Sequence, residues 1–263
     1  MTIVLIAAVA YFVATGLLIA GLRRNGETGT PRTWLAPAIG AVVLHASVHL
    51  LASRGAGGAD LHFFAALSLV GLGMAALTTS VGAWGKMAAL GVVVFPLAAL
   101  TLLSYRTHGH VPALHLDWRR LLHAWLALLA YATLAIAALL AIMLWLQERA
   151  LRRREFHSWS RALPPLVVLE TLLFRTITAG FILLSAALLT GLLFVEDLLA
   201  QHLVHKTVLS VGSWLAFGAL LIGRWRLGWR GSVAVRWTLV AMAFLLLALF
   251  GSKFVLELVL QYP

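Results

Sequence analysis

Eight long apolar segments set the strongest limit on what this chain can fold into. They cover about residues 2–22, 33–52, 61–83, 87–105, 121–146, 174–195, 207–223 and 237–260. A helix needs about 20 apolar residues to cross the hydrocarbon core of a bilayer, and inside that core every backbone polar group must be hydrogen-bonded within the protein. The pattern therefore predicts an all-α protein, a polytopic helical membrane bundle with about eight transmembrane helices.

The composition agrees with a membrane protein and excludes several kinds of chemistry. The chain is 62% hydrophobic and 11% charged, whereas soluble domains are about 45–50% apolar and about 25% charged. The sequence contains no cysteine, which excludes disulfides, thiol redox centres, cysteine-based zinc sites and cysteine attachment of haem to this chain.

No connection between the apolar segments is long enough to form a separate soluble unit, so we expect one integral-membrane domain over residues 1–263. One segment allows two interpretations. Pro164 and Pro165 precede apolar residues at helical spacing, with Glu170 and Arg175 among them. Residues 164–177 are either an amphipathic helix lying in the membrane interface or the early start of a long sixth span.

The basic residues predict how the bundle is oriented. Arg23 and Arg24 follow the first span, and the first, third, fifth and seventh connections carry 13 of the 20 Lys and Arg residues, against 5 in the alternate connections. Basic residues collect in cytoplasmic loops. We therefore expect both termini on the outer, periplasmic side and the 149–161 loop inside. The formal charge of +11 is accounted for in this way, and no motif indicates nucleic-acid binding.

The histidines show the opposite bias. With this orientation, nine of the ten lie at or near the outer face, and only His157 is cytoplasmic. His45 and His49 are in the outer half of the second span, while His123 and His205 stand at the outer ends of two other spans. Basic residues gather on the other side, so the clustering of histidines is not a general polar bias.

Imidazole binds transition metals and haem iron, and ionisable groups inside a membrane are functional candidates. His45 and His49 are four residues apart and share one helix face. Two histidines from different helices, such as His123 and His205, can hold a haem plane from opposite sides. The alternatives are polar anchors at the interface and a His-rich zinc or copper site. The few outer carboxylates disfavour calcium or magnesium.

The sequence contains no HExxH, GxSxG or phosphate-loop motif, so nothing in it indicates hydrolysis or phosphoryl transfer. Whether the protein is an enzyme is left open by the sequence. A haem-bearing oxidoreductase is one alternative that these motifs do not address.

Several short motifs, taken in order, resemble the cytochrome c assembly family, which contains the CcsA and CcmC haem-handling proteins, and within it the short inner-membrane branch of YpjD- and HemX-like proteins. The resemblance covers nearly the whole chain. The motifs are Leu122-His123-Ala124-Trp125 with Ala130-Tyr131-Ala132, the block from Pro164 through Glu170 and Gly180 to Thr190-Gly191-Leu192, His205-Lys206-Thr207 with Trp214, Gly228-Trp229-Arg230-Gly231, and Phe250-Gly251-Ser252.

This resemblance implies a multi-pass protein of the bacterial inner membrane that binds haem b non-covalently near the periplasmic face. The family uses histidines at the outer ends of spans as axial ligands. Carried over to this sequence, His123 and His205 are the expected ligands of the haem iron, with His45 or His49 nearby. The implied role is haem trafficking or cytochrome c assembly, with the lipid bilayer, haem and other cytochrome assembly membrane proteins as partners.

Two departures from the family pattern limit that expectation. The external loop from Val195 to Lys206 has no tryptophan, although haem-delivering members carry a tryptophan-rich motif there. The late histidine of the full haem-lyase pattern is replaced by Gly223-Arg224-Trp225-Arg226. We therefore expect haem binding rather than delivery to apocytochrome. The alternative functions are a membrane scaffold without a cofactor and a small-solute permease.

Overall fold

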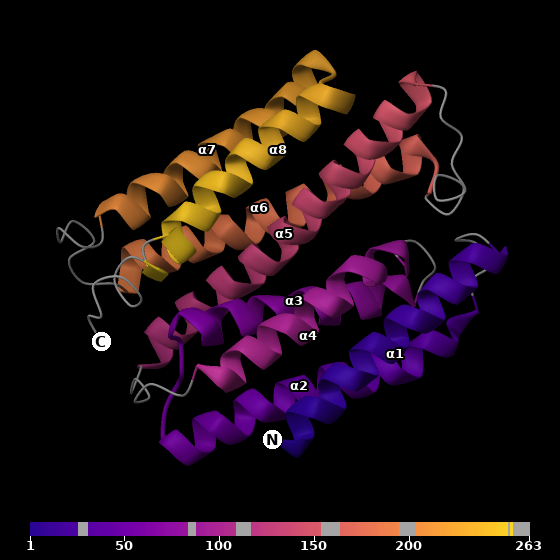
Figure 1. The fold of residues 1–263 in the computed structure, drawn as a ribbon. Helices are drawn as coiled ribbons and strands as arrows, with labels where there is room; N and C mark the ends of the chain where they lie inside the picture. The colour runs from indigo at the N-terminus through magenta and orange to yellow at the C-terminus, as the bar shows by residue number, and fades with distance from the viewer. Residues whose placement is uncertain are drawn as a thin grey trace. The chain divides into compact units, whose positions relative to one another are not determined.

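The computed structural model describes residues 1–25, 31–83, 88–108, 117–153, 164–194, 204–251 and 253–254. Within these ranges the regular structure is helical, without β-strands (Figure 1). The helices are α1 (Thr2–Asn25), α2 (Leu35–Ala56), α3 (Phe63–Gly82), α4 (Gly91–Thr107), α5 (Trp118–Arg152), α6 (Leu166–Phe194), α7 (Val204–Leu227) and α8 (Gly231–Leu246). Short 3-10 turns, Arg32–Trp34 and Ala88–Leu90, precede α2 and α4, and a π-helical turn, Leu247–Gly251, follows α8.

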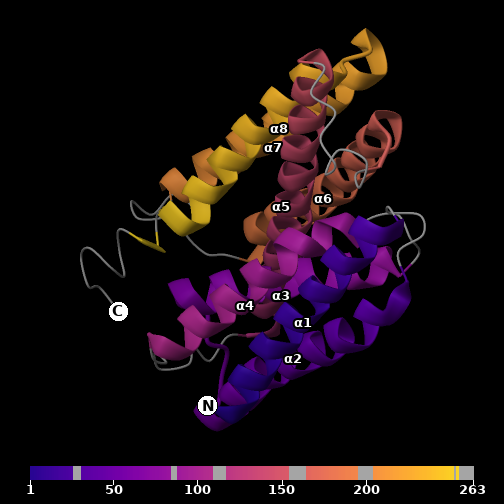
Figure 2. The ribbon, with the colours of Figure 1, turned by 45° about the vertical axis from the view of Figure 1, so that its right-hand side comes forward.

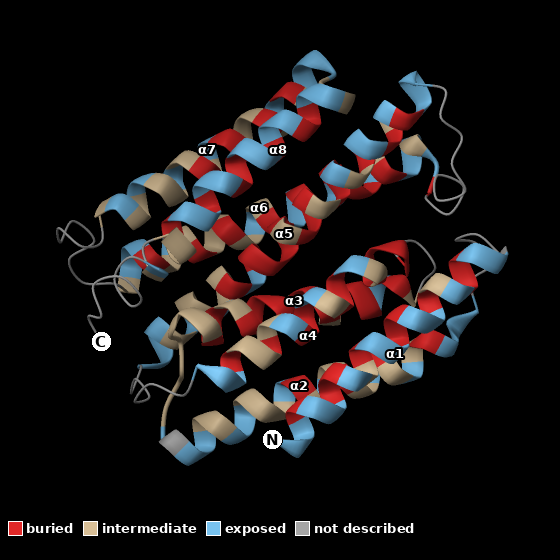
Figure 3. Ribbon diagram, in the orientation of Figure 1, coloured by how far each residue is buried: buried red, intermediate tan, exposed pale blue. Residues whose placement is uncertain are grey.

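In the described part of the chain, eight helices are long and apolar enough to cross a membrane. The prediction of an all-α polytopic membrane protein is therefore confirmed. Helix α1 shows why such a helix needs lipid around it, because Ile6, Val9, Phe12 and Val13 are exposed large apolar side chains on this one helix. Exposed and buried residues alternate in bands along the helices (Figure 3).

Two helices are longer than their apolar segments. Helix α5 has 35 residues, because its charged ends stay helical beyond the apolar stretch. Helix α6 runs without a break from Leu166 over 29 residues, so the structure shows the early start of one long helix rather than a separate interfacial helix. Within α6, Glu170 is paired with α7, because Nη1 of Arg224 lies 2.7 Å from its Oε1 and neutralises the carboxylate.

The chain divides into two compact units, described here one at a time: unit 1 is Met1–His115 with Ala150–Pro165, and unit 2 is Leu116–Arg149 with Leu166–Pro263. That residues 1–263 form a single membrane domain stays a prediction. In unit 1, α1 packs on α2 and α4, and α3 packs on α4; the four helices lie side by side in both views (Figures 1 and 2). Small residues allow this close packing: a side chain on Gly71 of α3 would collide with Thr101 of α4.

In unit 2, α7 packs on α6 and α8. Hydrogen bonds between side chains and backbone join the helices. The Ser213 hydroxyl of α7 donates to the carbonyl oxygen of Ala241 in α8 at 2.8 Å, and the Tyr131 hydroxyl of α5 donates to that of Leu245 at 2.7 Å. Gly180 of α6 lies against Leu134 of α5, leaving no room for a β-carbon. These contacts bring the first turns of α5 and α7 and the last turns of α6 to one end of the unit.

Candidate functional site

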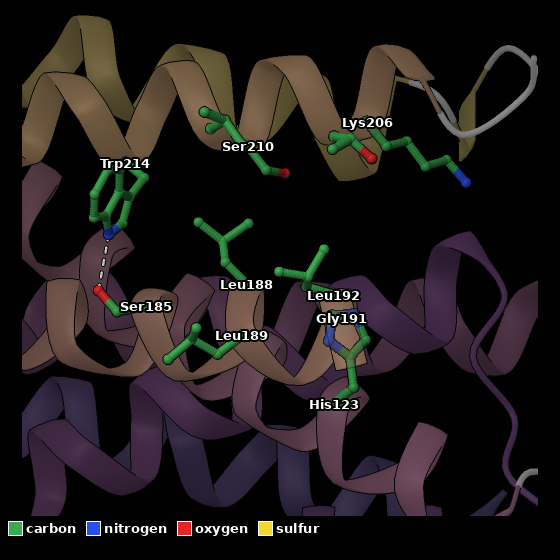
Figure 4. Close-up of a pocket in the computed structure, with 11 residues that line it drawn as sticks. His123, Ser185, Leu188, Leu189, Gly191, Leu192, Lys206, Ser210 and Trp214 are labelled. Carbon is green, nitrogen blue, oxygen red and sulfur yellow. Dashed lines mark hydrogen bonds between the residues drawn. The ribbon is translucent and has the colours of Figure 1, made fainter. Parts of the chain in front are cut away.

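A pocket with a volume of about 520 Å³ lies in unit 2, between the start of α5, the end of α6 and the start of α7 (Figure 4). This volume is within the range of about 300–1,000 Å³ that is typical of small-molecule sites. Most of the lining side chains are apolar, and a few polar ones are placed among them. The lining residues are His123, Ser185, Leu188, Leu189, Gly191, Leu192, Lys206, Thr207, Ser210, Val211 and Trp214.

Polar groups stand at both ends of the pocket, and Ser210 lies between them (Figure 4). Figure 4 shows His123, Gly191 and Lys206 at one end and Trp214 with Ser185 at the other. Trp214 donates its indole N–H to the Ser185 hydroxyl at 2.8 Å and stacks on the ring of Phe181, with centroids 5.5 Å apart. At this end Trp214 and Ser185 are hydrogen-bonded to each other. The titratable groups of the pocket, His123 and Lys206, lie at the opposite end.

His123 has a fixed tautomer. Its Nδ1 atom lies 2.9 Å from the backbone carbonyl oxygen of Ala187 and 3.4 Å from the hydroxyl of Thr190. A carbonyl oxygen can only accept a hydrogen bond, so Nδ1 carries the proton. The neutral ring then has its lone pair on Nε2, for which the described residues provide no hydrogen-bond partner. Proteins orient metal-ligating histidines in this way, by a hydrogen bond from the ring nitrogen that does not bind the metal.

Gly191 allows the ring of His123 to take this position. A β-carbon on Gly191 would lie 3.0 Å from Cε1 and 3.3 Å from Nδ1 of the imidazole. The ring of His123 therefore packs directly on the backbone of α6, one helical turn after Ala187. Glycine at position 191 and the carbonyl oxygen of Ala187, which also accepts from the Thr190 hydroxyl at 3.0 Å, together position a half-buried histidine.

Lys206 adds a positive charge to the end of the pocket where His123 lies. It is in the first turn of α7 and is half-buried, with Thr207 next to it in the lining. A neutral imidazole, apolar walls and an ammonium group are the features that a flat, mostly apolar ligand with acidic substituents would need. A lysine stem can lie along apolar surface while its charge remains at the edge.

His205, the second histidine predicted for the site, precedes Lys206 in the first turn of α7. Its side chain is exposed, and it does not contribute to the lining of the pocket. The structure thus brings His123 and His205 to the same end of unit 2 but places only His123 on the pocket wall.

His45 and His49 belong to unit 1 and form part of a buried polar cluster there. Nδ1 of His45 lies 3.2 Å from the Tyr11 hydroxyl, and Nε2 of His45 and Nε2 of His49 each lie 2.9 Å from the Ser68 hydroxyl. Both ring nitrogens of His45 are therefore in hydrogen bonds. The structure brings these two histidines together, as their four-residue spacing predicts.

Among the described residues, no group of three or more histidine, cysteine or acidic side chains could hold a metal ion. The described residues therefore contain no cluster of side chains for a His-rich zinc or copper site. His110, His115, His157 and His202 lie outside the described residues.

Sequence reasoning identified His123 from its apolar surroundings but missed the other pocket residues as a set. Ser185, Leu188, Leu189 and Leu192 follow one face of α6, and Thr207, Ser210, Val211 and Trp214 follow one face of α7. Their spacing of three and four residues is a recognisable helical pattern. Which of the two faces meet depends on how the helices pack, and the pattern alone does not contain that information.

Comparison with known proteins gives matches over most of the chain. The family described as "Cytochrome C assembly protein" matches residues 33–260. The chain is 32% identical to the "Inner membrane protein YpjD" of Escherichia coli K12 and of E. coli O157:H7, over 97% of this chain and 98% of each relative. It is 31% identical to a 28.8 kDa protein of Azospirillum brasilense over 81% of this chain and 91% of that protein. No solved structure matches. With the eight spanning helices, these relatives indicate a multi-pass inner-membrane protein.

Proposed function

Because the chain belongs to the cytochrome c assembly protein family, we propose that it binds haem b non-covalently in the α5–α6–α7 pocket and acts in haem trafficking. Family membership itself supports a role in cytochrome c biogenesis. The observation that carries the haem proposal is the tautomer of His123, whose Nδ1 is held by the Ala187 carbonyl oxygen, so that Nε2 is the nitrogen with a lone pair.

The residues of the pocket fit haem by their chemistry. When bound, haem would supply an iron that takes an imidazole nitrogen as a ligand, an apolar macrocycle and two propionates. His123 provides the nitrogen, the leucines of α6 provide apolar walls, and Lys206 provides a cation at the same end as His123. Within this proposal, His123 orients the ligand, the leucines exclude water from it, and Lys206 binds its acidic groups.

His205 is the proposed second ligand. It lies in the first turn of α7, next to Lys206, and in the structure its side chain is exposed. Ligation by His205 therefore requires its side chain to turn toward the pocket. If His123 alone holds the iron, the His205→Ala variant keeps its haem, so the two arrangements are distinguishable by one substitution.

The proposal does not extend to His45 and His49 as iron ligands. Both nitrogens of His45 and Nε2 of His49 are already in hydrogen bonds within unit 1. That these histidines lie near the haem stays a prediction, and His45→Ala tests it, because the haem spectrum of this variant would change only if His45 contributes to the site.

The proposed orientation places the pocket at the periplasmic face. The ends of α5, α6 and α7 that form it are those that the distribution of basic residues assigns to the outer side, together with both termini. Partners that receive or supply haem there, including other cytochrome assembly membrane proteins, are part of the same proposal.

Titration of the purified protein with haem tests the proposal. We expect a Soret band that saturates at one haem per chain, a loss of affinity of at least about tenfold in His123→Ala, and recovery of the band when imidazole is added to that variant. His108→Ala, which changes an exposed histidine of unit 1, is the matched control. A saturating band unaffected by His123→Ala contradicts the assignment of the ligand, and no band at all contradicts haem binding.

A further inference from the structure

The polar cluster of unit 1 forms a continuous chain of hydrogen-bonding groups in an apolar core. Tyr11, His45 and Ser68 are fully buried, on α1, α2 and α3 respectively. Contacts of 3.2, 2.9 and 2.9 Å connect the Tyr11 hydroxyl, the two ring nitrogens of His45, the Ser68 hydroxyl and Nε2 of His49 in that order. We propose that this chain is a one-sided proton path, in which Ser68 passes protons between His49 and His45.

The chain can be satisfied in two opposite directions. In one arrangement, Tyr11 donates to Nδ1 of His45, His45 donates through Nε2 to Ser68, and Ser68 donates to Nε2 of His49. In the other, His49 donates to Ser68, Ser68 donates to Nε2 of His45, and His45 donates through Nδ1 to Tyr11. Serine can do both because its hydroxyl donates one hydrogen bond and accepts others. A chain that is satisfied in either direction is what proton transfer requires.

A single transfer step balances without any redox partner. A proton from solvent converts neutral His49 to imidazolium. The Nε2–H bond of His49 then breaks as the Ser68 oxygen takes that proton, and the original Ser68 hydroxyl proton moves to Nε2 of His45. His49 is neutral again, Ser68 is again a hydroxyl, and His45 carries the positive charge.

The entrance to the path is at His49, which is only partly buried. Its ring stacks on that of Tyr105 from α4, with centroids 4.5 Å apart, and the Tyr105 hydroxyl donates to Asp60 at 3.1 Å. Asp60 also accepts from Nδ1 of His62 at 2.5 Å. A carboxylate and two further proton-binding groups therefore stand at the open end of the path, with Arg106 next to Tyr105 on α4.

His62 adds a second, independent indication that protons are handled here. Its side chain is 8% exposed, and its Nε2 atom is buried without a hydrogen-bond partner among the described residues. With Nδ1 bonded to Asp60, Nε2 carries a lone pair in the neutral ring and an N–H in the imidazolium, so it is the atom at which this ring gains or loses a proton. A buried polar atom without a partner is costly, and ionisable chains within membranes are associated with proton relays.

The other end of the path is closed by aromatic rings. Phe95 of α4 stacks on Tyr11 with centroids 5.9 Å apart, and Trp34 lies against Phe95 at 6.0 Å; both are fully buried. Protons that reach Tyr11 therefore meet an apolar layer rather than a further acceptor. The path therefore exchanges protons between the α2–α3 end of unit 1 and the middle of this unit. It does not cross the membrane.

Exchange of the buried Tyr11 O–H and His45 N–H after transfer of the full chain into D2O tests this path. Infrared spectroscopy follows both groups, and difference spectra against Tyr11→Phe and His45→Phe assign their bands. We expect fast exchange in the natural protein and exchange at least about tenfold slower in Ser68→Ala, because deuterons can then reach these groups only when the unit opens. Ser213→Ala, a buried serine of unit 2, is the matched control and should exchange like the natural protein.

The sign of the effect separates a path from a purely structural network. If Ser68 only stabilises the fold, Ser68→Ala loosens unit 1 and exchange becomes faster, which overturns the proposal, as does an unchanged rate. If Ser68→Ala does not fold, His49→Phe keeps the ring but removes its nitrogens and should slow exchange in the same way. Proton leakage through proteoliposomes that contain the protein would overturn the one-sided path.

Discussion

Nδ1 of His123 lies 2.9 Å from the carbonyl oxygen of Ala187, 64 residues further along the chain. This one contact determines which nitrogen of the ring carries the lone pair, and it joins the start of α5 to the end of α6. The same carbonyl oxygen also accepts from the hydroxyl of Thr190 at 3.0 Å, and that hydroxyl lies 3.4 Å from Nδ1 of His123. The ligand nitrogen of the proposed haem site is therefore prepared before any ligand binds.

Substitution of Gly191 by alanine tests whether this preparation matters. The new β-carbon would lie 3.0 Å from Cε1 of His123, so the ring must shift away from Ala187. We expect Gly191→Ala to weaken haem binding by about tenfold with little change in thermal stability. Gly212→Ala in α7 is the control, because the only atom near its β-carbon is in Phe244, at 3.8 Å. Equal haem affinities in the two variants would contradict the expectation.

Lys206→Gln tests whether a cation at the His123 end of the pocket binds acidic groups. The change removes the charge and keeps a side chain of similar length. We expect weaker binding of haem, by about 1–2 kcal/mol for a charge-assisted contact, and unchanged binding of haem dimethyl ester, which has no carboxylates. Arg120→Gln, an exposed residue near the start of α5, controls for the general loss of positive charge. A similar loss of affinity for both ligands would show that Lys206 acts in another way.

The fold was largely predictable from sequence because membrane insertion depends on local hydropathy. Apolar stretches of the length needed to cross a bilayer reveal the spans wherever they occur. Helix ends were less predictable. The sequence of residues 164–177 allowed two interpretations, and the pairing of Glu170 with Arg224, 54 residues away, is not contained in any local pattern.

The site was predictable only in part. His123 stood out as an ionisable residue in an apolar segment, but its partner is a backbone carbonyl of Ala187, and every residue has one. His62 counted only as one of the nine histidines at or near the outer face, because its significance comes from Asp60 and Tyr105, the latter on another helix. Contacts between helices define both sites, and such contacts are not visible in the residue pattern of a single helix.

Asp60 should make the stability of the protein depend on pH. Burial alone would raise the pKa of Asp60, but the hydrogen bond from His62, the charge of that ring, and further hydrogen bonds from the His62 amide and the Tyr105 hydroxyl hold this pKa below its ordinary value. A depressed pKa in the folded state means that ionised Asp60 stabilises the fold. That stability is fully present above the ordinary pKa of about 4 and is lost as the pH falls through the lower folded-state value.

We therefore expect Asp60→Asn to lower the free energy of unfolding at pH 7 by about 1–3 kcal/mol, and to lower it much less at acidic pH, where the natural carboxyl is protonated. Thermal unfolding in detergent at a series of pH values measures the difference. Asp117→Asn, an exposed aspartate just before α5, should show no such dependence. A destabilisation by Asp60→Asn that is constant from pH 7 to pH 3 would show that its ionisation does not matter.

Tyr131 provides a test that separates the stability of unit 2 from its proposed ligand. Its buried hydroxyl donates to the carbonyl oxygen of Leu245 at 2.7 Å, just before the π-helical turn Leu247–Gly251. A π turn shifts the hydrogen-bond register of a helix, so carbonyl groups at its start need partners from elsewhere. Tyr131→Phe keeps the ring and removes the hydroxyl, which also has a backbone hydrogen bond with Leu249. We expect the free energy of unfolding to fall by about 1–2 kcal/mol, measured by thermal unfolding, with haem affinity unchanged because Tyr131 does not line the pocket. Thr133→Val is the control: among the described residues, the Thr133 hydroxyl bonds to the Leu129 carbonyl of its own helix alone, so its loss should cost less. If Tyr131→Phe instead lowered haem affinity without lowering stability, the end of α8 would have to be part of the binding site.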